Sequence, residues 1–268
     1  MSSSPTALPA RLLRWSGLGW FCVAAIGQLA FIGFILAFYG VRTVTGRFAD
    51  WNDKPLIKGY VGGDDLGNVV FAAHVLLAAV LTLAGLMQLI PGLRRTRPRL
   101  HRWTGRLFLF LAAVGALSGV WLTVVRETYL SPISGAAILL DAVLILIFGG
   151  LALTRALQRR FEAHRVWAMR TFMVVSGVWF LRVGLMGWVL VNRGPVGMND
   201  SMSGPADIVM AFGSYLIPLA LLELYLATTR SRYAAPKLLA ALLVGAAALF
   251  TAVGVFGTIA LMWSPYLW

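Results

Sequence analysis

The sequence predicts an all-α fold, a polytopic membrane bundle of seven transmembrane helices, from three observations. Hydrophobic residues make up 59% of the chain and charged residues only 12%, whereas soluble domains carry about 25% charged residues. The mean hydropathy is +0.81. The apolar residues gather in runs that each reach the length of about 20 residues that crosses a bilayer. Helices follow, because helices or closed barrels alone satisfy their backbone polar groups inside lipid.

The helices are expected at residues 15–41, 67–92, 103–125, 135–156, 167–191, 207–227 and 238–263. The first run is about twice as long as the apolar core of a signal peptide, so we interpret it as a retained helix. The chain is then expected to form one integral membrane domain, 1–268. Small residues favour close helix packing in the third and last helices, and Pro218 is expected to kink the sixth. The small residues are Gly115, Gly119, Gly245, Gly254 and Gly257.

Basic residues predict the orientation. With the N-terminus inside, 16 of the 23 lysines and arginines fall in inner segments, while the loop aspartates lie outside. The positive-inside rule therefore predicts N-in, C-out, with one extended outer loop from about Arg42 to Leu66 as a partial lid. The net charge of +13 does not indicate nucleic-acid binding, because the excess lies in short loops where it meets anionic lipid headgroups.

Ionisable residues inside spans are rare and usually functional or paired. His74, Asp141 and Arg182 fall at similar depths, about 9–14 Å below the outer surface at the helical rise per residue. We expect an Asp141–Arg182 ion pair with His74 hydrogen-bonded nearby. Two interpretations stay open for this outer cluster: a buried pair that fixes helix packing, or an outward-facing ligand pocket or proton-handling site.

A second group lies toward the inner surface. Arg106, Arg170 and Glu223 have matching depths, so Glu223 is expected to neutralise one of the arginines, and His101 and His164 lie one turn shallower. The histidines could contact lipid headgroups at the interface. Alternatively they could face each other and ligate a b-type haem, with arginines on its propionates, or hold a quinone headgroup. Binding of a specific anionic lipid is the third alternative.

Several kinds of site are not indicated. Cys22 is the one cysteine, so neither an intrachain disulfide nor a thiolate metal site is expected. The three histidines divide between opposite membrane faces, which excludes a zinc site with three histidine ligands. No nucleophile elbow, H-E-x-x-H or phosphate loop occurs. The sequence therefore favours a protein without catalytic machinery.

Three stretches resemble a known bacterial family. They are His74 in the second run, the motif Leu100-His-Arg-Trp-x-Gly-Arg106 before the third, and His164-Arg-x-Trp-x-x-Arg170 before the fifth, with Arg182 beyond. This combination resembles the multi-pass family catalogued as domain of unknown function 2306. The resemblance covers about residues 67–188 and implies a bacterial inner-membrane location. It also implies that the family shares its polar positions: His74, His101, Arg106, His164, Arg170 and Arg182.

Three functions are compatible with these features. The first is an accessory or assembly subunit of a membrane complex, or a module that binds lipid or quinone. The second is a redox protein with b haem at His101 and His164, which an absorption spectrum would reveal. The third is a proton-coupled transporter of a small solute that uses His74, Asp141 and Arg182. We rank transport last, because transporters often contain broken helices and only Pro218 is expected to interrupt a span.

Overall fold

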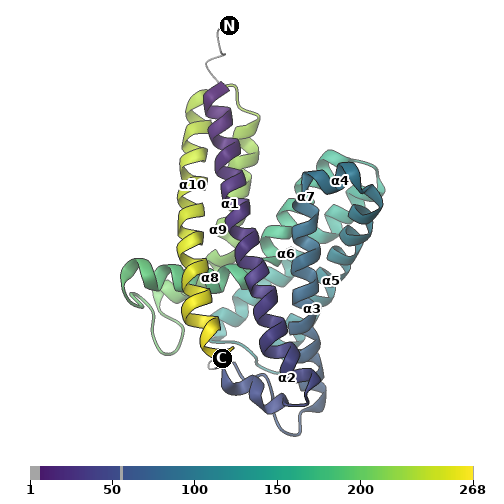
Figure 1. Cartoon of the computed structure of the whole chain (residues 1–268), viewed down its shortest axis with the longest axis vertical. Coiled ribbons are helices and arrows are strands. Elements are labelled where there is room, and N and C mark those ends of the chain that lie inside the picture. The colour runs from purple at the N-terminus through teal and green to yellow at the C-terminus, as the bar shows by residue number, and fades with distance from the viewer. Residues whose placement is uncertain (1–6, 55–56, 268) are drawn as a thin grey trace.

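A computed structural model describes residues 7–54 and 57–267 of the chain. Regular structure in this part is entirely helical, which confirms the predicted fold class (Figure 1). Six helices are long and apolar enough to cross a membrane, and a bent pair of shorter helices makes a seventh span. The predicted number of spans therefore agrees with the structure when the bent pair is taken as one.

The helices follow one another as α1 (Ala7–Phe34), the π-helical η1 (Ile35–Gly40), α2 (Val41–Val44), the 3-10 helix η2 (Phe48–Asp53), α3 (Asp65–Leu89), α4 (Pro91–Thr96), α5 (Pro98–Val124), α6 (Pro132–Leu157), α7 (Phe161–Val175), α8 (Gly177–Asn192), α9 (Pro205–Thr229), α10 (Ala234–Gly257), the π-helical η3 (Thr258–Trp263) and η4 (Ser264–Tyr266). The first span runs unbroken through α1, η1 and α2, and the last continues from α10 to Tyr266.

Most helices begin before the apolar run that predicted them. Pro98, Pro132 and Pro205 occupy the first turns of α5, α6 and α9, ahead of the expected starts at 103, 135 and 207. Proline suits the first helical turn, because its fixed φ is already helical and its missing N–H would have no partner there. The apolar runs mark the lipid-facing parts, and each helix extends beyond them into the interface.

The fifth span, expected over 167–191, contains a break that was not predicted. The run is divided at Ser176 into α7 and α8, whose axes differ by 53°. The break coincides with the pair Ser176–Gly177, and such pairs are a known cause of sharp kinks. In the sixth span, where Pro218 was expected to cause a kink, α9 continues as a helix through Pro218. The sequence therefore contained a signal for the break in the fifth span, in the Ser176–Gly177 pair.

The helices form two groups, which pack on each other where α9 meets α6 and α7 and where α1 meets α3. Figure 1 shows α1, α9 and α10 standing together on one side, with α3, α5, α6 and α7 on the other and α8 lying across the long axis. Neighbouring helices within each group pack together, and α8 packs on α9 and α10. The start of α1 and the end of the last span lie toward opposite ends of the molecule (Figure 1), as an odd number of passes requires. The side of the membrane on which each lies remains a prediction.

Glycines bring α8 and α10 into close contact. A Cβ on Gly254 would collide with the backbone carbonyl oxygen of Val183, and one on Gly187 would lie 2.9 Å from the Phe250 ring. Small residues permit this approach of backbones, which gains dispersion contacts that lipid does not replace. The close packing expected for the last helix is therefore confirmed at Gly254, and α8 is held rigidly in its transverse position.

Candidate functional site

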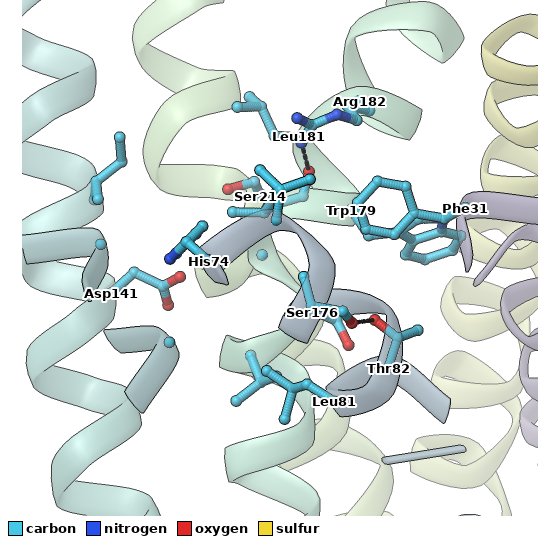
Figure 2. A pocket seen from close by; sticks show the side chains of 18 of the residues that line it. Phe31, His74, Leu81, Thr82, Asp141, Ser176, Trp179, Leu181, Arg182 and Ser214 are labelled. Atoms are coloured by element: carbon cyan, nitrogen blue, oxygen red, sulfur yellow. Dashed lines mark hydrogen bonds between the residues drawn. The ribbon is translucent and has the colours of Figure 1, made fainter. Parts of the chain in front are cut away.

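A cavity of about 490 Å³ lies in the centre of the bundle. Its wall comes from α1, α3, α5, α6, the α7–α8 junction and α9, and most of the lining residues are apolar. Polar side chains interrupt the apolar wall, among them Gln28, Lys54, His74, Thr82, Ser118, Asp141, Ser176, Arg182 and Ser214. Figure 2 shows several of them around this space, among them His74, Asp141 and Arg182. The structure therefore brings the three residues of the predicted outer cluster to one cavity.

His74 projects from α3 and is hydrogen-bonded to α5. Its Nδ1 lies 2.8 Å from the Ser118 hydroxyl, which itself donates to the carbonyl oxygen of Val114 at 2.8 Å. With the serine hydrogen directed at Val114, the tautomer that fits has Nδ1–H donating to Ser118. In this tautomer the lone pair lies on Nε2, and Ser118 is the hydrogen-bond partner of His74 in the described part of the chain. His74 thus presents a hydrogen-bond acceptor at the wall of the cavity.

Asp141 projects from α6 and is 9% exposed. Its Oδ1 is enclosed without a partner among the described residues. Its Oδ2 lies at the start of α8, where a Cβ on Gly177 would be only 2.9 Å away. The glycine after the break therefore makes room for the carboxyl group. A buried carboxyl group without a hydrogen bond is costly, so this position is a candidate for a ligand or ordered water.

The expected ion pair between Asp141 and Arg182 is absent, and this expectation is corrected. Neither residue takes part in an ion pair within 4.0 Å in the part of the chain that the structure describes. The Arg182 guanidinium lies 5.5 Å from the centroid of the Phe31 ring on α1, and its Nη1 donates to the carbonyl oxygen of Val178 at 2.8 Å. Equal depth did not imply pairing, because the bend at Ser176 directs α8 away from α7.

Two residues of the cavity were missed by sequence reasoning. Gln28 on α1 is 1% exposed, and its Nε2 donates to Ser176 Oγ at 3.0 Å, which ties the first span to the break. Its Oε1 is buried without a partner among the described residues. A glutamine within an apolar run was the available signal, since such side chains usually hydrogen-bond across helices. The second is Lys54, in the outer loop.

The outer loop covers one end of this region. Trp51 is 2% exposed and packs against Phe71 of α3. Arg126 binds the loop from the far side, through an ion pair with Asp64 at 2.9 Å and hydrogen bonds to the carbonyl oxygens of Gly59 and Gly67. Lys54 and Ile57 belong to both the loop and the cavity wall. The arrangement fits the predicted partial lid.

The inner cluster is only partly assembled. Arg170 on α7 forms a bidentate ion pair with Glu223 on α9, with Nε–Oε1 and Nη2–Oε2 distances of 2.6 and 2.8 Å. Glu223 therefore neutralises one of the two arginines, as their matched depths predicted. Arg106 instead lies over the Trp103 ring of its own helix at 5.2 Å. The arginines consequently do not form a joint clamp.

The two inner histidines lie near one another but outside the cavity. Nδ1–H of His164 donates to the carbonyl oxygen of Ala152 at 2.9 Å. His101 has Arg94 and His164 as neighbours, and its Nδ1 is buried without a partner in the described residues. The lining of the central cavity includes none of His101, Arg106, His164, Arg170 and Glu223. Within residues 7–54 and 57–267, no three His, Cys, Asp or Glu side chains could together hold a metal ion.

A comparison with protein families matches residues 71–226 to the family described as "Predicted membrane protein (DUF2306)". This region is more than half of the chain. The chain belongs to the DUF2306 family. The DUF2306 region runs from α3 into α9 and contains every member of the two predicted clusters, whereas Gln28 and Lys54 lie outside it. No curated protein and no solved structure matches the chain.

Proposed function

We propose that this integral membrane protein is a binding module for an apolar small molecule that carries a polar head, of the lipid or quinone class. The observation that carries the proposal is the placement of His74, Asp141 and Arg182. They come from three helices, border one apolar cavity, and make no ion pair with one another. Ionisable groups at such depth need a polar partner.

The size and chemistry of the cavity support this class of ligand. Small-molecule sites range over about 300–1,000 Å³ and combine an apolar wall with a few oriented polar groups. The cavity of about 490 Å³ has this composition, with an acceptor at His74 Nε2 and a donor group at Arg182. An amphiphilic molecule would satisfy both the apolar wall and the polar groups.

The test uses two substitutions on one helix. Ala78 lines the cavity, while Ala73 on the same helix is exposed and lies outside the lining. We expect purified wild-type protein to release a co-purifying apolar compound on organic extraction, measured by mass spectrometry. Ala78→Phe should reduce its amount by about tenfold, because the ring fills ligand space, and Ala73→Phe should leave it unchanged. Equal amounts from the two variants would reject the proposal.

A second candidate, transport of a small solute, is favoured by the break at Ser176. Broken helices that border a binding site at mid-membrane are characteristic of secondary transporters, and α7 and α8 break at the wall of the cavity. Transport was ranked last on the expectation that only Pro218 interrupts a span, and this expectation no longer holds. Transport predicts proton-driven solute flux in proteoliposomes that Asp141→Asn abolishes. Flux that is unaffected by Asp141→Asn would exclude this candidate.

A further inference from the structure

The ligand's polar head can be assigned a charge. Resting on the proposed function, we infer that the cavity takes an anionic amphiphile, with its carboxylate or phosphate head between Arg182 and Lys54 and its tail along the apolar wall. The inference rests on two cations that lie at one side of the cavity and have no acidic partner.

Arg182 and Lys54 lie over adjacent rings of the first span. The Arg182 guanidinium is 5.5 Å from the Phe31 centroid, and the Lys54 amine is 5.1 Å from the Phe34 centroid. Phe31 and Phe34 are three residues apart and so occupy one face of α1. The two cations therefore lie near one another, although they come from α8 and from the outer loop.

Nearby acids are already bound by other arginines. Asp53, next to Lys54 in the chain, pairs with Arg42 at 3.2 Å. The ion pairs within 4.0 Å in the described residues also join Asp64 to Arg126 and Asp50 to Arg47, and none includes Lys54 or Arg182. Buried charges are ordinarily paired. Two neighbouring cations without an acid form a binding site for an anion.

The pKa of the Lys54 amine shows that its positive charge is unfavourable at this position when no anion is bound. Burial, and to a lesser degree the positive charge of Arg182, lower the pKa of Lys54 from 10.5 to about 7. A bound anionic head would favour the protonated amine through a charge-assisted hydrogen bond. Asp141, the one acid in the lining, lies on the side of the cavity away from Phe31 (Figure 2). Asp141 therefore does not pair with Arg182 or Lys54 in place of the ligand.

The apolar wall of the cavity offers a binding surface for the hydrocarbon tail of the ligand. Beyond the two cations the cavity is lined by aliphatic and aromatic side chains such as Leu81, Leu111 and Trp179. Burial of a hydrocarbon chain among them gains roughly 0.8 kcal/mol per methylene group. A free inorganic anion would leave this wall without a partner, so the amphiphile is the better fit.

The experiment compares the binding of amphiphiles that share one hydrocarbon tail and differ in the polar head group. Protein in nanodiscs is labelled with a photoreactive fatty acid, and palmitate, hexadecyl phosphate, hexadecanol and inorganic phosphate compete for the site. We expect the anionic amphiphiles to compete at concentrations about tenfold lower than hexadecanol, a difference equivalent to about 1.4 kcal/mol. Palmitate against hexadecyl phosphate then distinguishes a carboxylate from a phosphate head. Arg182→Gln and Lys54→Gln should each reduce the difference between the anionic amphiphiles and hexadecanol. The control Lys58→Gln, at an exposed residue of the same loop, should leave this difference unchanged.

The possible outcomes test the anionic head separately from the proposed binding function. Labelling of cavity residues with equal competition by hexadecanol and palmitate would overturn the anionic head and leave the binding function intact. If inorganic phosphate were the only effective competitor, the inference that the ligand is an amphiphile would be wrong. Absence of labelling at the cavity would overturn the anionic amphiphile, and the extraction experiment with Ala78→Phe and Ala73→Phe decides the proposed function separately. If Arg182→Gln fails to fold, the competitor series on wild-type protein and Lys54→Gln still decide.

Discussion

At the scale of single residues, the charges inside the bundle fall into two kinds. Arg170 and Glu223 form a bidentate pair, and such a pair fixes α7 against α9 through directional bonds. Asp141 and Arg182 share a cavity without forming a pair within 4.0 Å. The first kind is explained by structure, whereas the second still requires partners, which is why the functional proposals rest on it.

A pair of double-mutant cycles should separate these kinds. For Arg170→Met with Glu223→Leu, we expect the double variant to be more stable than the sum of the single losses predicts. The expected coupling is about 0.5–3 kcal/mol, because each single change leaves a charge without its partner. For Asp141→Leu with Arg182→Met, the losses should add to within about 0.5 kcal/mol. Thermal unfolding in nanodiscs measures both, and strong coupling in the second cycle would contradict the described geometry.

Lys54 gives a prediction about pH. Its pKa is lowered by burial to about 7 in the folded protein and is 10.5 ordinarily. The folded state therefore binds fewer protons between these values, so the destabilisation by Lys54 is complete below pH 7 and declines as the pH rises. The positive charge of Arg182 contributes to the shift, and the preceding residue Asp53 is bound by Arg42.

Accordingly, Lys54→Met should raise the melting temperature of ligand-free protein more at about pH 6 than at about pH 9. The matched control is Lys58→Met, because Lys58 is exposed in the same loop and should show no such dependence. Equal gains at both pH values for Lys54→Met would show that the amine is not buried in solution.

At the scale of the elements, the transverse helix α8 determines the site. It carries Arg182, begins at the Gly177 that adjoins Asp141, and is held by α10. The bend of 53° separates it in direction from α7. Without this bend, Arg182 would remain on the line of α7, and the side chain could not pack over Phe31 of α1.

Glycine substitutions on α10 test the support of α8. A Cβ on Gly254 meets the carbonyl oxygen of Val183, whereas one on Gly245 meets nothing within 4 Å. We expect Gly254→Ala to lower the melting temperature clearly, since backbone has to move, with a loss of roughly 1–3 kcal/mol as in other overpacked sites. Gly245→Ala should be neutral or stabilising by up to about 1 kcal/mol from helix propensity. Similar melting temperatures for the two variants would contradict the close contact.

At the scale of the whole molecule, the number of passes and the charge distribution together predict which end faces the cytoplasm. The N-terminal end of α1 and the basic segment near α4 lie toward one end of the molecule, opposite α2 (Figure 1). The positive-inside rule assigns that basic end to the cytoplasm. The cavity's Lys54 would then lie toward the outer surface.

Cysteine labelling in intact cells tests this orientation. In a Cys22→Ser background, a membrane-impermeant maleimide should modify Lys58→Cys, because the loop that contains Lys58 is outside. It should not modify Arg232→Cys, in the turn between α9 and α10, until the cells are permeabilised. Both native side chains are exposed. The reverse pattern would invert the topology and place the lid of the cavity in the cytoplasm.

The sequence predicted much of the fold because lipid imposes strong rules. Backbone groups have to be satisfied within each span, so apolar runs of sufficient length become helices, and six of the seven predicted spans are single continuous helices. The depth of His74, Asp141 and Arg182 was also readable from position along each run. The Ser176–Gly177 pair marked the one exception, but its effect depends on the neighbours that stabilise a bend.

What the sequence determined by itself is therefore the helical class, the number of candidate spans, the position of each polar residue along its span and membership of a multi-pass family. What only the tertiary structure decided is which of those residues meet. Helix rotation and the bend at Ser176 place Arg182 on Phe31, join Gln28 to Ser176, and leave Asp141 beside Gly177. Depth is a property of one helix and follows from its apolar run. Contact is a property of two helices and depends on how each is turned about its axis, which packing against all the others fixes.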